Sequence, residues 1–381
     1  MIVTRTCTDR DKSDMKNLWR ELFRDSISFT DWFFENRFYP EYCACTYDDE
    51  LLVSCAHSVP MPLLIRAKEI PSAMISGVAT IEAYRKKGLM HKTFRYLVNE
   101  LNSKGFSAAT LKAVSRPVYY SLNYYECTKS TYIHSCKDEE YLFPADWEDY
   151  DRNGINKNIV CKKIDIINES DNLHSCYNSF IKNYSAVAIR DNNAFKLKMN
   201  DYLSDDAKAI AVFRNGSISG YCIYFDEEEI QAEEYIASDK ASACLLFKKL
   251  KEERKNITLK TSQRAAEWLE SRDTETEEQN SMGIINVSEL LKVICNNSDY
   301  RIKVTDSFYK ENNGIYLFNG QKSEGKCHLE MPSGQLMQLL TGFRSLEELA
   351  SSGNAVIHDK TACDEIARML PKQNCFIVDE Y

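Results

Sequence analysis

The sequence lacks the common motifs of metal binding, membrane insertion and export. Its 14 cysteines include no C-x-x-C pair, and its 6 histidines include no H-E-x-x-H pattern, so we expect no bound metal. No stretch approaches the roughly 18 consecutive apolar residues of a membrane span, and the first residues have no apolar core of signal-peptide length. We therefore expect a cytoplasmic protein with reduced thiols and no membrane partner.

An excess of basic charge is also missing. The chain has 57 acidic and 48 basic residues, a net charge of -9, which argues against nucleic acid as a partner and is compatible with a cationic small molecule. With 44% hydrophobic and 28% charged residues, the composition is that of a globular protein. Its 381 residues suggest two to three domains, each with a core of its own.

Neither of the two common phosphate loops, G-x-x-x-x-G-K-[ST] and G-x-G-x-x-G, is present. A different turn nevertheless has the chemistry to hold phosphate. An apolar run at 74–81 predicts a strand, the basic residues 85–87 and Gly88 follow, and a helical pattern begins at Leu89. The first turn of a helix presents unpaired N–H groups and the positive end of the dipole, and glycine lets the backbone approach a ligand closely.

The spacing R-x-x-G after a strand resembles the pyrophosphate loop of the GNAT acetyltransferases, which holds coenzyme A. A second segment about thirty residues later supports this resemblance. GNAT enzymes carry the pattern Y-x-x-x-G-F/Y there, and this chain has Tyr119-Tyr120-Ser121-Leu122-Asn123-Tyr124. Asparagine replaces the glycine, which is a mild departure because asparagine tolerates a left-handed turn better than other non-glycine residues.

A second unit follows a polar stretch at 137–154. Helical patterns at about 173–184 and 192–203 precede strand-like runs at 207–213, 218–225 and 230–237, and then a helix at 240–253. The order resembles the first unit, but Ser238-Asp239-Lys240 replaces the R-x-x-G turn. The unit is either a GNAT-like domain without its cofactor loop or an unrelated α/β domain.

A third unit begins near 282, after an acidic stretch at 274–280 that we expect to be a loop or a domain edge. Helical patterns are found at 333–340, 345–350 and 361–370. The chain then finishes with an apolar run, which predicts a tail docked on the protein rather than a free end.

The three units together resemble the Eis-type (enhanced intracellular survival) acetyltransferases. The segments GVATIEAYRKKGLM, VYYSLNYYECT, SMGIINVSELL, LLTGFRSLEELA and CFIVDEY carry this resemblance. It implies an α/β fold with an active GNAT domain at 1–135, a degenerate GNAT-like domain at 136–280 and a sterol-carrier-protein-like domain at 281–381. It also implies a homo-oligomer, specifically a hexamer.

The same resemblance implies acetyl-CoA as the co-substrate and assigns roles to individual residues. Tyr124 is the expected general acid for the departing thiolate, and the C-terminal carboxylate of Tyr381 is the expected base. The residues expected to hold acetyl-CoA are Val78, Thr80, Arg85, Lys86, Gly88, Leu89 and Met90. Two departures leave the acceptor open: the last residue is tyrosine where relatives often have phenylalanine, and Lys112 stands where a relative has a neutral or histidine-type residue.

The acceptor pocket has three candidate residues. The aromatic segment 29–42 is either core or a wall of this pocket, in which Trp32 would contact the acceptor and Asp31 would supply negative charge. Glu380 would attract a cation near the end of the chain. We therefore expect direct acetyl transfer to an amine of a cationic small molecule, similar to an aminoglycoside or a polyamine. The alternatives are a protein or peptide lysine acetyltransferase and a non-catalytic protein that binds an apolar ligand.

Overall fold

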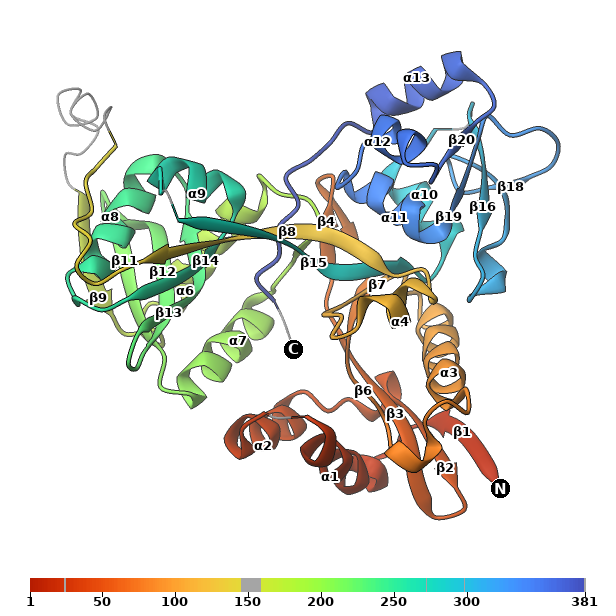
Figure 1. The fold of residues 1–381 in the computed structure, drawn as a ribbon, viewed down its shortest axis with the longest axis horizontal. Coiled ribbons are helices and arrows are strands. Elements are labelled where there is room, and N and C mark those ends of the chain that lie inside the picture. Colours follow the sequence, from red (N-terminus) through yellow and green to blue (C-terminus); the bar gives the residue numbers. More distant parts are fainter. Residues whose placement is uncertain (24, 145–158, 272, 298, 380–381) are drawn as a thin grey trace.

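A long mixed sheet forms the centre of the computed structural model, which describes residues 1–23, 25–144, 159–271, 273–297 and 299–379 (Figure 1). Its 12 strands, in spatial order, are β1 (Ile2–Thr6), β2 (Ala44–Asp48), β3 (Leu51–Pro60), β6 (Ser72–Thr80), β7 (Ala108–Leu111), β15 (Thr274–Ile284), β8 (Tyr125–Ser135), β14 (Ile257–Thr261), β13 (Ile230–Ala237), β12 (Ser217–Asp226), β11 (Lys208–Arg214) and β9 (Ile159–Ile164).

The strands β8 and β15 join the two halves of this sheet and run side by side across the middle of the molecule (Figure 1). One end of β15 pairs with β7 of the first half, and the far end of β8 pairs with β14 of the second half. The prediction of a loop at 274–280 is therefore wrong. Its acidic side chains are mostly exposed, and the backbone pairing with β8 gives the segment a strand conformation despite its polar composition. The expected domain boundary at 280 lies inside this strand.

The first half carries its helices on the sheet faces. They are α1 (Lys12–Leu22), α2 (Ile27–Asn36), α3 (Leu89–Ser103) and α4 (Arg116–Tyr120), with short 3-10 turns η1 (Asp9–Asp11), η2 (Pro40–Tyr42) and η3 (Glu82–Tyr84). The predicted inner face of α3 is confirmed, because Phe94, Leu97, Val98 and Leu101 are all buried. This helix packs on β1, β2, β3 and β6.

The second half repeats the strand–helix–strand arrangement of the first. Its helices are α6 (Ser170–Ile181), α7 (Asn192–Ser204), α8 (Lys240–Lys251) and α9 (Gln263–Leu269). The predicted antiparallel strands are present, and α8 then connects β13 to the parallel strand β14, as α3 connects β6 to β7. The side chain of Asp239 caps α8 by accepting from the N–H of Ser242. A carboxylate therefore occupies the position where a phosphate would bind, which disfavours a second anion there.

The last unit has a sheet of its own. Its strands, in spatial order, are β18 (Lys322–Ser323), β17 (Gly314–Leu317), β16 (Arg301–Thr305), β19 (Leu329–Pro332) and β20 (Val356–Ile357). Its helices are α10 (Val287–Ile294), α11 (Ser333–Thr341), α12 (Leu346–Ser351) and α13 (Lys360–Met369), with the turn η4 (Lys310–Asn312). All residues of α11 are buried, because this helix packs against β8 and β15 as well as β16 and β19.

The C-terminal tail is docked, as the sequence predicts. It crosses β8 and β15 toward α7 (Figure 1). Phe376, Ile377 and Val378 are buried, and the N–H of Lys129 donates to the carbonyl of Cys375 at 3.0 Å. A small sheet of β10 (Val187–Ala188), β4 (Leu63–Ile65) and β5 (Lys68–Ile70) lies nearby. Among the helices of the described residues, none combines the length and the apolar character that crossing a bilayer requires.

Candidate acyl-CoA site

A cavity opens where two parallel strands of the first half separate. Strands β6 and β7 pair only from Ser72–Met74 to Ala108–Thr110, and beyond this point they diverge. The cavity has a volume of about 310 Å³. It is lined by Leu22, Phe23, Val78, Ala79, Thr80, Arg85, Met90, Val114, Ser115, Val118 and Tyr119. These residues come from the end of α1, the end of β6 and the turn after it, the start of α3, and the segment from β7 into α4. Four parts of the first half therefore line one cavity.

Backbone irregularity on β6 prepares this cavity. The register between β3 and β6 shifts between Cys55 and His57, so that Gly77 and Val78 have no partner on β3. Gly77 adopts a φ of +53°, and a Cβ there would lie 2.2 Å from Cζ3 of Trp19. Only glycine fits at this position, because the indole of α1 occupies the side-chain space. On the other edge of β6 the pairing with β7 has already ended at Met74, so Val78 reaches the cavity without a one-to-one partner on either neighbouring strand.

The loop from β6 to α3 has the features of a phosphate-binding turn. Gly88 is the N-cap of α3 with a φ of +76°, and within the described parts of the chain no side-chain hydrogen bond caps the helix there. A Cβ on Gly88 would meet no heavy atom within 4 Å, so the space in front of the helix is open. The guanidinium of Arg85 is tied to this turn by a bond from Nε to the carbonyl of Thr80 at 3.1 Å. Uncapped N–H groups, open space and nearby cations together fit a pyrophosphate group.

The residues predicted to hold acetyl-CoA fall into two groups. Val78, Thr80, Arg85 and Met90 line the cavity. The others belong to the turn and the start of the helix. Lys86 and Gly88 are exposed, whereas the side chain of Leu89 is buried. Leu89 can therefore contact a cofactor only through its backbone N–H. The structure therefore brings all seven predicted residues to the cavity or to the adjoining turn.

Comparisons with known proteins identify the domain that contains this cavity. Residues 3–127 match the family model of an acetyltransferase (GNAT) domain. Residues 289–378 match that of a sterol carrier protein domain. The chain carries a GNAT acetyltransferase domain. The expectation drawn from the loop and the tyrosine-rich segment is thereby confirmed at the level of the family, and the sterol carrier protein domain accounts for the third unit.

Solved structures confirm the fold of the whole chain. A GCN5-related N-acetyltransferase from Anabaena variabilis ATCC 29413 is 14% identical with a TM-score of 0.83, and the similarity covers 100% of both chains. Eis1 from Mycobacterium abscessus is 13% identical with a TM-score of 0.77, again over 100% of both chains. A GCN5-related N-acetyltransferase from Kribbella flavida is 12% identical with a TM-score of 0.79, over 100% of this chain and 98% of that one. A search of curated proteins gives no match.

The tyrosine that lines the cavity of the GNAT domain is Tyr119, and the structure does not bring Tyr124 there. Tyr124 is 3% exposed and packs edge-on against Phe94, with ring centroids 5.4 Å apart. Its hydroxyl has no hydrogen-bond partner among the described residues, and burial raises its pKa far above the ordinary value. Burial raises the pKa of Tyr119 to about 12.

The backbone explains why the two tyrosines differ. Tyr119 belongs to helix α4, which borders the cavity. Asn123 then adopts a φ of +60°, and its amide donates to Asp306 at 2.9 Å and to Ser307 at 3.2 Å. This left-handed turn, as expected from asparagine, directs Tyr124 into the core beneath α3. The sequence could have indicated Tyr119, because it is the first tyrosine of the motif and lies in the helical part before the turn at Asn123.

The predicted acceptor residues on α2 do not line this cavity. Asp31 forms ion pairs with Lys16 and Arg20 of α1, and its hydrogen bond to Lys16 lowers its pKa. Trp32 packs against the hydrophobic cluster shared by α1 and α2. The prediction missed Leu22 and Phe23, which lie at the end of α1 and line the cavity instead.

The predicted residues at the end of the chain, Glu380 and Tyr381, lie outside the described residues, and their roles stay predictions. Asp379, just before them, is buried and forms a bidentate ion pair with Arg190 at 3.0 and 3.1 Å. Glu234 binds the other side of the same guanidinium at 2.9 and 3.0 Å. Burial opposes the charge of Asp379, but Arg190 lowers its pKa overall. This carboxylate therefore anchors the tail rather than attracting a cation from solvent.

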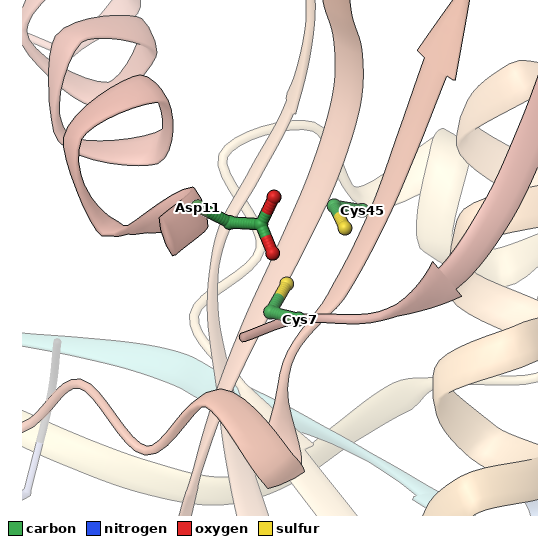
Figure 2. Close-up of side chains that lie close together, drawn as sticks. All are labelled: Cys7, Asp11 and Cys45. Atoms are coloured by element: carbon green, nitrogen blue, oxygen red, sulfur yellow. The ribbon is translucent and has the colours of Figure 1, made fainter. Parts of the chain in front are cut away.

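Two clusters of metal-ligand type occur elsewhere in the described residues. Cys7, Asp11 and Cys45 place their ligand atoms within 4.8 Å of one another (Figure 2). Asp11 is already bonded to Arg5 at 2.7 and 2.8 Å and to the hydroxyl of Tyr47 at 2.8 Å.

One thiol of this first cluster, that of Cys7, is not available to a metal as the thiolate that it needs. A hydrogen bond to Cys45 and burial raise the pKa of Cys7, which keeps that thiol protonated. In the second cluster, of Cys327, Glu330 and His358, Glu330 binds Lys303 at 2.9 Å. In both clusters, the carboxylate is already paired with a basic side chain of the protein, Arg5 in the first and Lys303 in the second.

Proposed function

We propose that this chain transfers an acyl group from acyl-CoA, with acetyl-CoA as the donor, to an amine. GNAT domains draw the acyl group from a coenzyme A thioester, and the family match supports that chemistry here. The observation that carries the proposal is the continuity between the cavity at the divergence of β6 and β7 and the uncapped turn before α3. A thioester arm lying in the cavity would have its pyrophosphate at Arg85, Lys86 and Gly88.

The residues around the cavity suit the requirements of acyl transfer. The amine attacks only in its neutral form, because a protonated amine has no free electron pair. As it attacks, negative charge develops on the thioester carbonyl oxygen, and the backbone N–H of Val78, at the bulge beside the cavity, can stabilise that charge. The tetrahedral intermediate collapses with loss of the thiolate, and the amine nitrogen passes its proton to the C-terminal carboxylate of Tyr381, the base that the family resemblance implies, directly or through water.

We infer that Tyr119, rather than Tyr124, donates to the departing thiolate. Its pKa of about 12 keeps the hydroxyl protonated at neutral pH, and its place in the cavity lining supports the role. Tyr124 is buried against Phe94 of α3 and does not line the cavity, so its hydroxyl is not placed beside the thioester.

A pair of substitutions tests this assignment. Tyr119→Phe should lower kcat roughly 10²-fold, the usual loss for a general acid, while the KM for acetyl-CoA changes little. Tyr124→Phe is the matched control, because it removes a hydroxyl of the same kind without touching the cavity, and it should leave kcat near the wild-type value. Full activity of Tyr119→Phe together with a large loss in Tyr124→Phe would restore the original assignment.

The acceptor in this proposal is an amine of a cationic small molecule. The net charge of -9 supports a cationic acceptor by long-range attraction. A screen of polyamines, aminoglycosides and lysine peptides, read out as release of free thiol, distinguishes this acceptor from a peptide lysine. Acetylation of the peptides alone would sink the small-molecule proposal. The predicted hexamer is measured separately, by light scattering on the eluting peak of a sizing column.

A further inference from the structure

A second cavity shares no lining residue with the acyl-CoA site, and its lining has the opposite net charge to the chain as a whole. Its volume is about 350 Å³, within the range of small-molecule sites. Strand β8, the start of α9, the connection from α11 to α12 and the C-terminal tail all contribute to its lining. Four cations line it, Lys129, Arg264, Arg344 and Lys372, against one carboxylate, Glu278.

Two of these cations are paired with carboxylates. Arg344 binds Glu278 at 2.6 and 2.7 Å, and Lys372 binds Glu348 at 2.7 Å. Lys129 lies opposite Glu278 in the ladder of β8 and β15, but Arg344 already occupies that carboxylate.

Among the described residues, neither Lys129 nor Arg264 has a carboxylate partner, and Arg264 lies over the ring of Trp268 at 5.1 Å. Both side chains line the cavity, although the chain has more acidic than basic residues. Their charge is therefore available to a ligand.

Neutral groups with exchangeable protons complete the lining. The hydroxyls of Tyr184 and Ser262 are 2.8 Å apart, and the amides of Gln263 and Asn374 also line the cavity. Guanidinium and ammonium groups, together with hydroxyl and amide groups, bind the oxygens of phosphates and carboxylates. Their hydrogen bonds are charge-assisted and are therefore stronger than those between neutral groups.

We propose that this cavity binds a small, multiply charged oxyanion, bearing phosphate or carboxylate groups, and that the anion holds the C-terminal tail in place. The tail forms one wall of the cavity from Lys372 to Phe376. Its backbone is attached on both sides, where Lys129 N–H donates to Cys375 at 3.0 Å and Ser185 N–H donates to Asn374 at 2.8 Å. An anion between Lys129 and Arg264 that also accepts from the side-chain amide of Asn374 would link the tail to β8 and α9. This site does not depend on the proposed acyl transfer.

Calorimetric titration with two probes, inorganic pyrophosphate and citrate, tests the proposal. Because the predicted acyl-CoA turn also attracts pyrophosphate, the background protein carries Arg85→Ala and Lys86→Ala. We expect saturable binding of at least one probe to this background. Adding Lys129→Gln and Arg264→Gln should weaken that binding at least about tenfold, as expected for the loss of charge-assisted bonds. These two substitutions replace a cation by a neutral, polar and shorter side chain, and circular dichroism confirms folding.

A matched control removes the same charge elsewhere. Lys248→Gln and Lys326→Gln, both exposed and outside the cavity, should leave probe binding unchanged in the same background. Hydrogen exchange gives an independent readout, in which the bound probe slows exchange at residues 372–378. A preference for pyrophosphate or for citrate assigns the phosphate or the carboxylate class. Absence of binding by both probes, or binding that the cavity substitutions leave unchanged, would overturn the proposal.

Discussion

Replacing Gly77 by alanine tests how the bulge beside the cavity is built. The new Cβ would lie 2.2 Å from Cζ3 and 2.6 Å from Cε3 of Trp19, so the indole or the strand has to move. The indole has little room to move, because its ring centroid lies 4.9 Å from that of Phe33 and 5.8 Å from those of Phe34 and His57. Overpacking of this kind costs about 1–3 kcal/mol, and the left-handed φ of +53° adds about 1–2 kcal/mol for alanine.

The expected loss of stability is therefore about 2–5 kcal/mol, a large fraction of the total for a natural domain. Gly88→Ala is the matched control, because its φ is also positive but its Cβ would meet nothing within 4 Å, so that only the backbone strain remains. Urea unfolding followed by tryptophan fluorescence measures both variants. Equal unfolding midpoints for Gly77→Ala and Gly88→Ala would refute the argument, since the close contact with Trp19 would then have no consequence.

Two further predictions concern buried charge. Burial lowers the pKa of His57 to about 3, so the unfolded chain binds a proton that the native protein does not between pH 6.5 and about 3. Stability should therefore fall as the pH decreases through that window, by up to about 1.4 kcal/mol per pH unit from this group. His57→Phe should flatten the dependence in acid unfolding experiments, and an unchanged slope would mean that His57 already titrates normally in the native state. Asp379→Asn should destabilise the protein by about 3 kcal/mol and speed hydrogen exchange in the tail, because Arg190 loses one of two buried partners. The exposed Asp364→Asn is its control, and equal exchange rates in the two variants would contradict the anchoring role.

The elements that local sequence determines were predictable. A basic turn with Gly88 between an apolar run and an amphipathic helix predicted the loop and the buried face of α3, because hydrophobic periodicity and glycine conformation act within a few residues. The apolar residues near the C-terminus predicted the docked tail, because apolar side chains favour burial over exposure to water. The family resemblance added the order of the units.

Features that depend on distant partners were not predictable in this way. The segment 274–280 is polar enough for a loop, and only its pairing with β8 makes it a strand. The carboxylate of Asp31 reads as a free charge in the sequence, but Lys16 and Arg20 neutralise it across the α1–α2 contact. Tyr119 and Tyr124 differ through the left-handed turn at Asn123, whose amide is held by a residue of the third unit. In each case the deciding partner is remote in the sequence.

Calorimetric titration with acetyl-CoA tests the central claim most directly. The account predicts saturable binding of one acetyl-CoA per chain. It also predicts that Arg85→Ala with Lys86→Ala weakens this binding about tenfold or more, because the charges beside the start of α3 are lost. Lys248→Gln with Lys326→Gln, which removes as much charge away from the cavity, should have no effect. Absence of binding by the intact protein, or equal affinity in all three proteins, would contradict the assignment of the cavity and its turn as the acyl-CoA site.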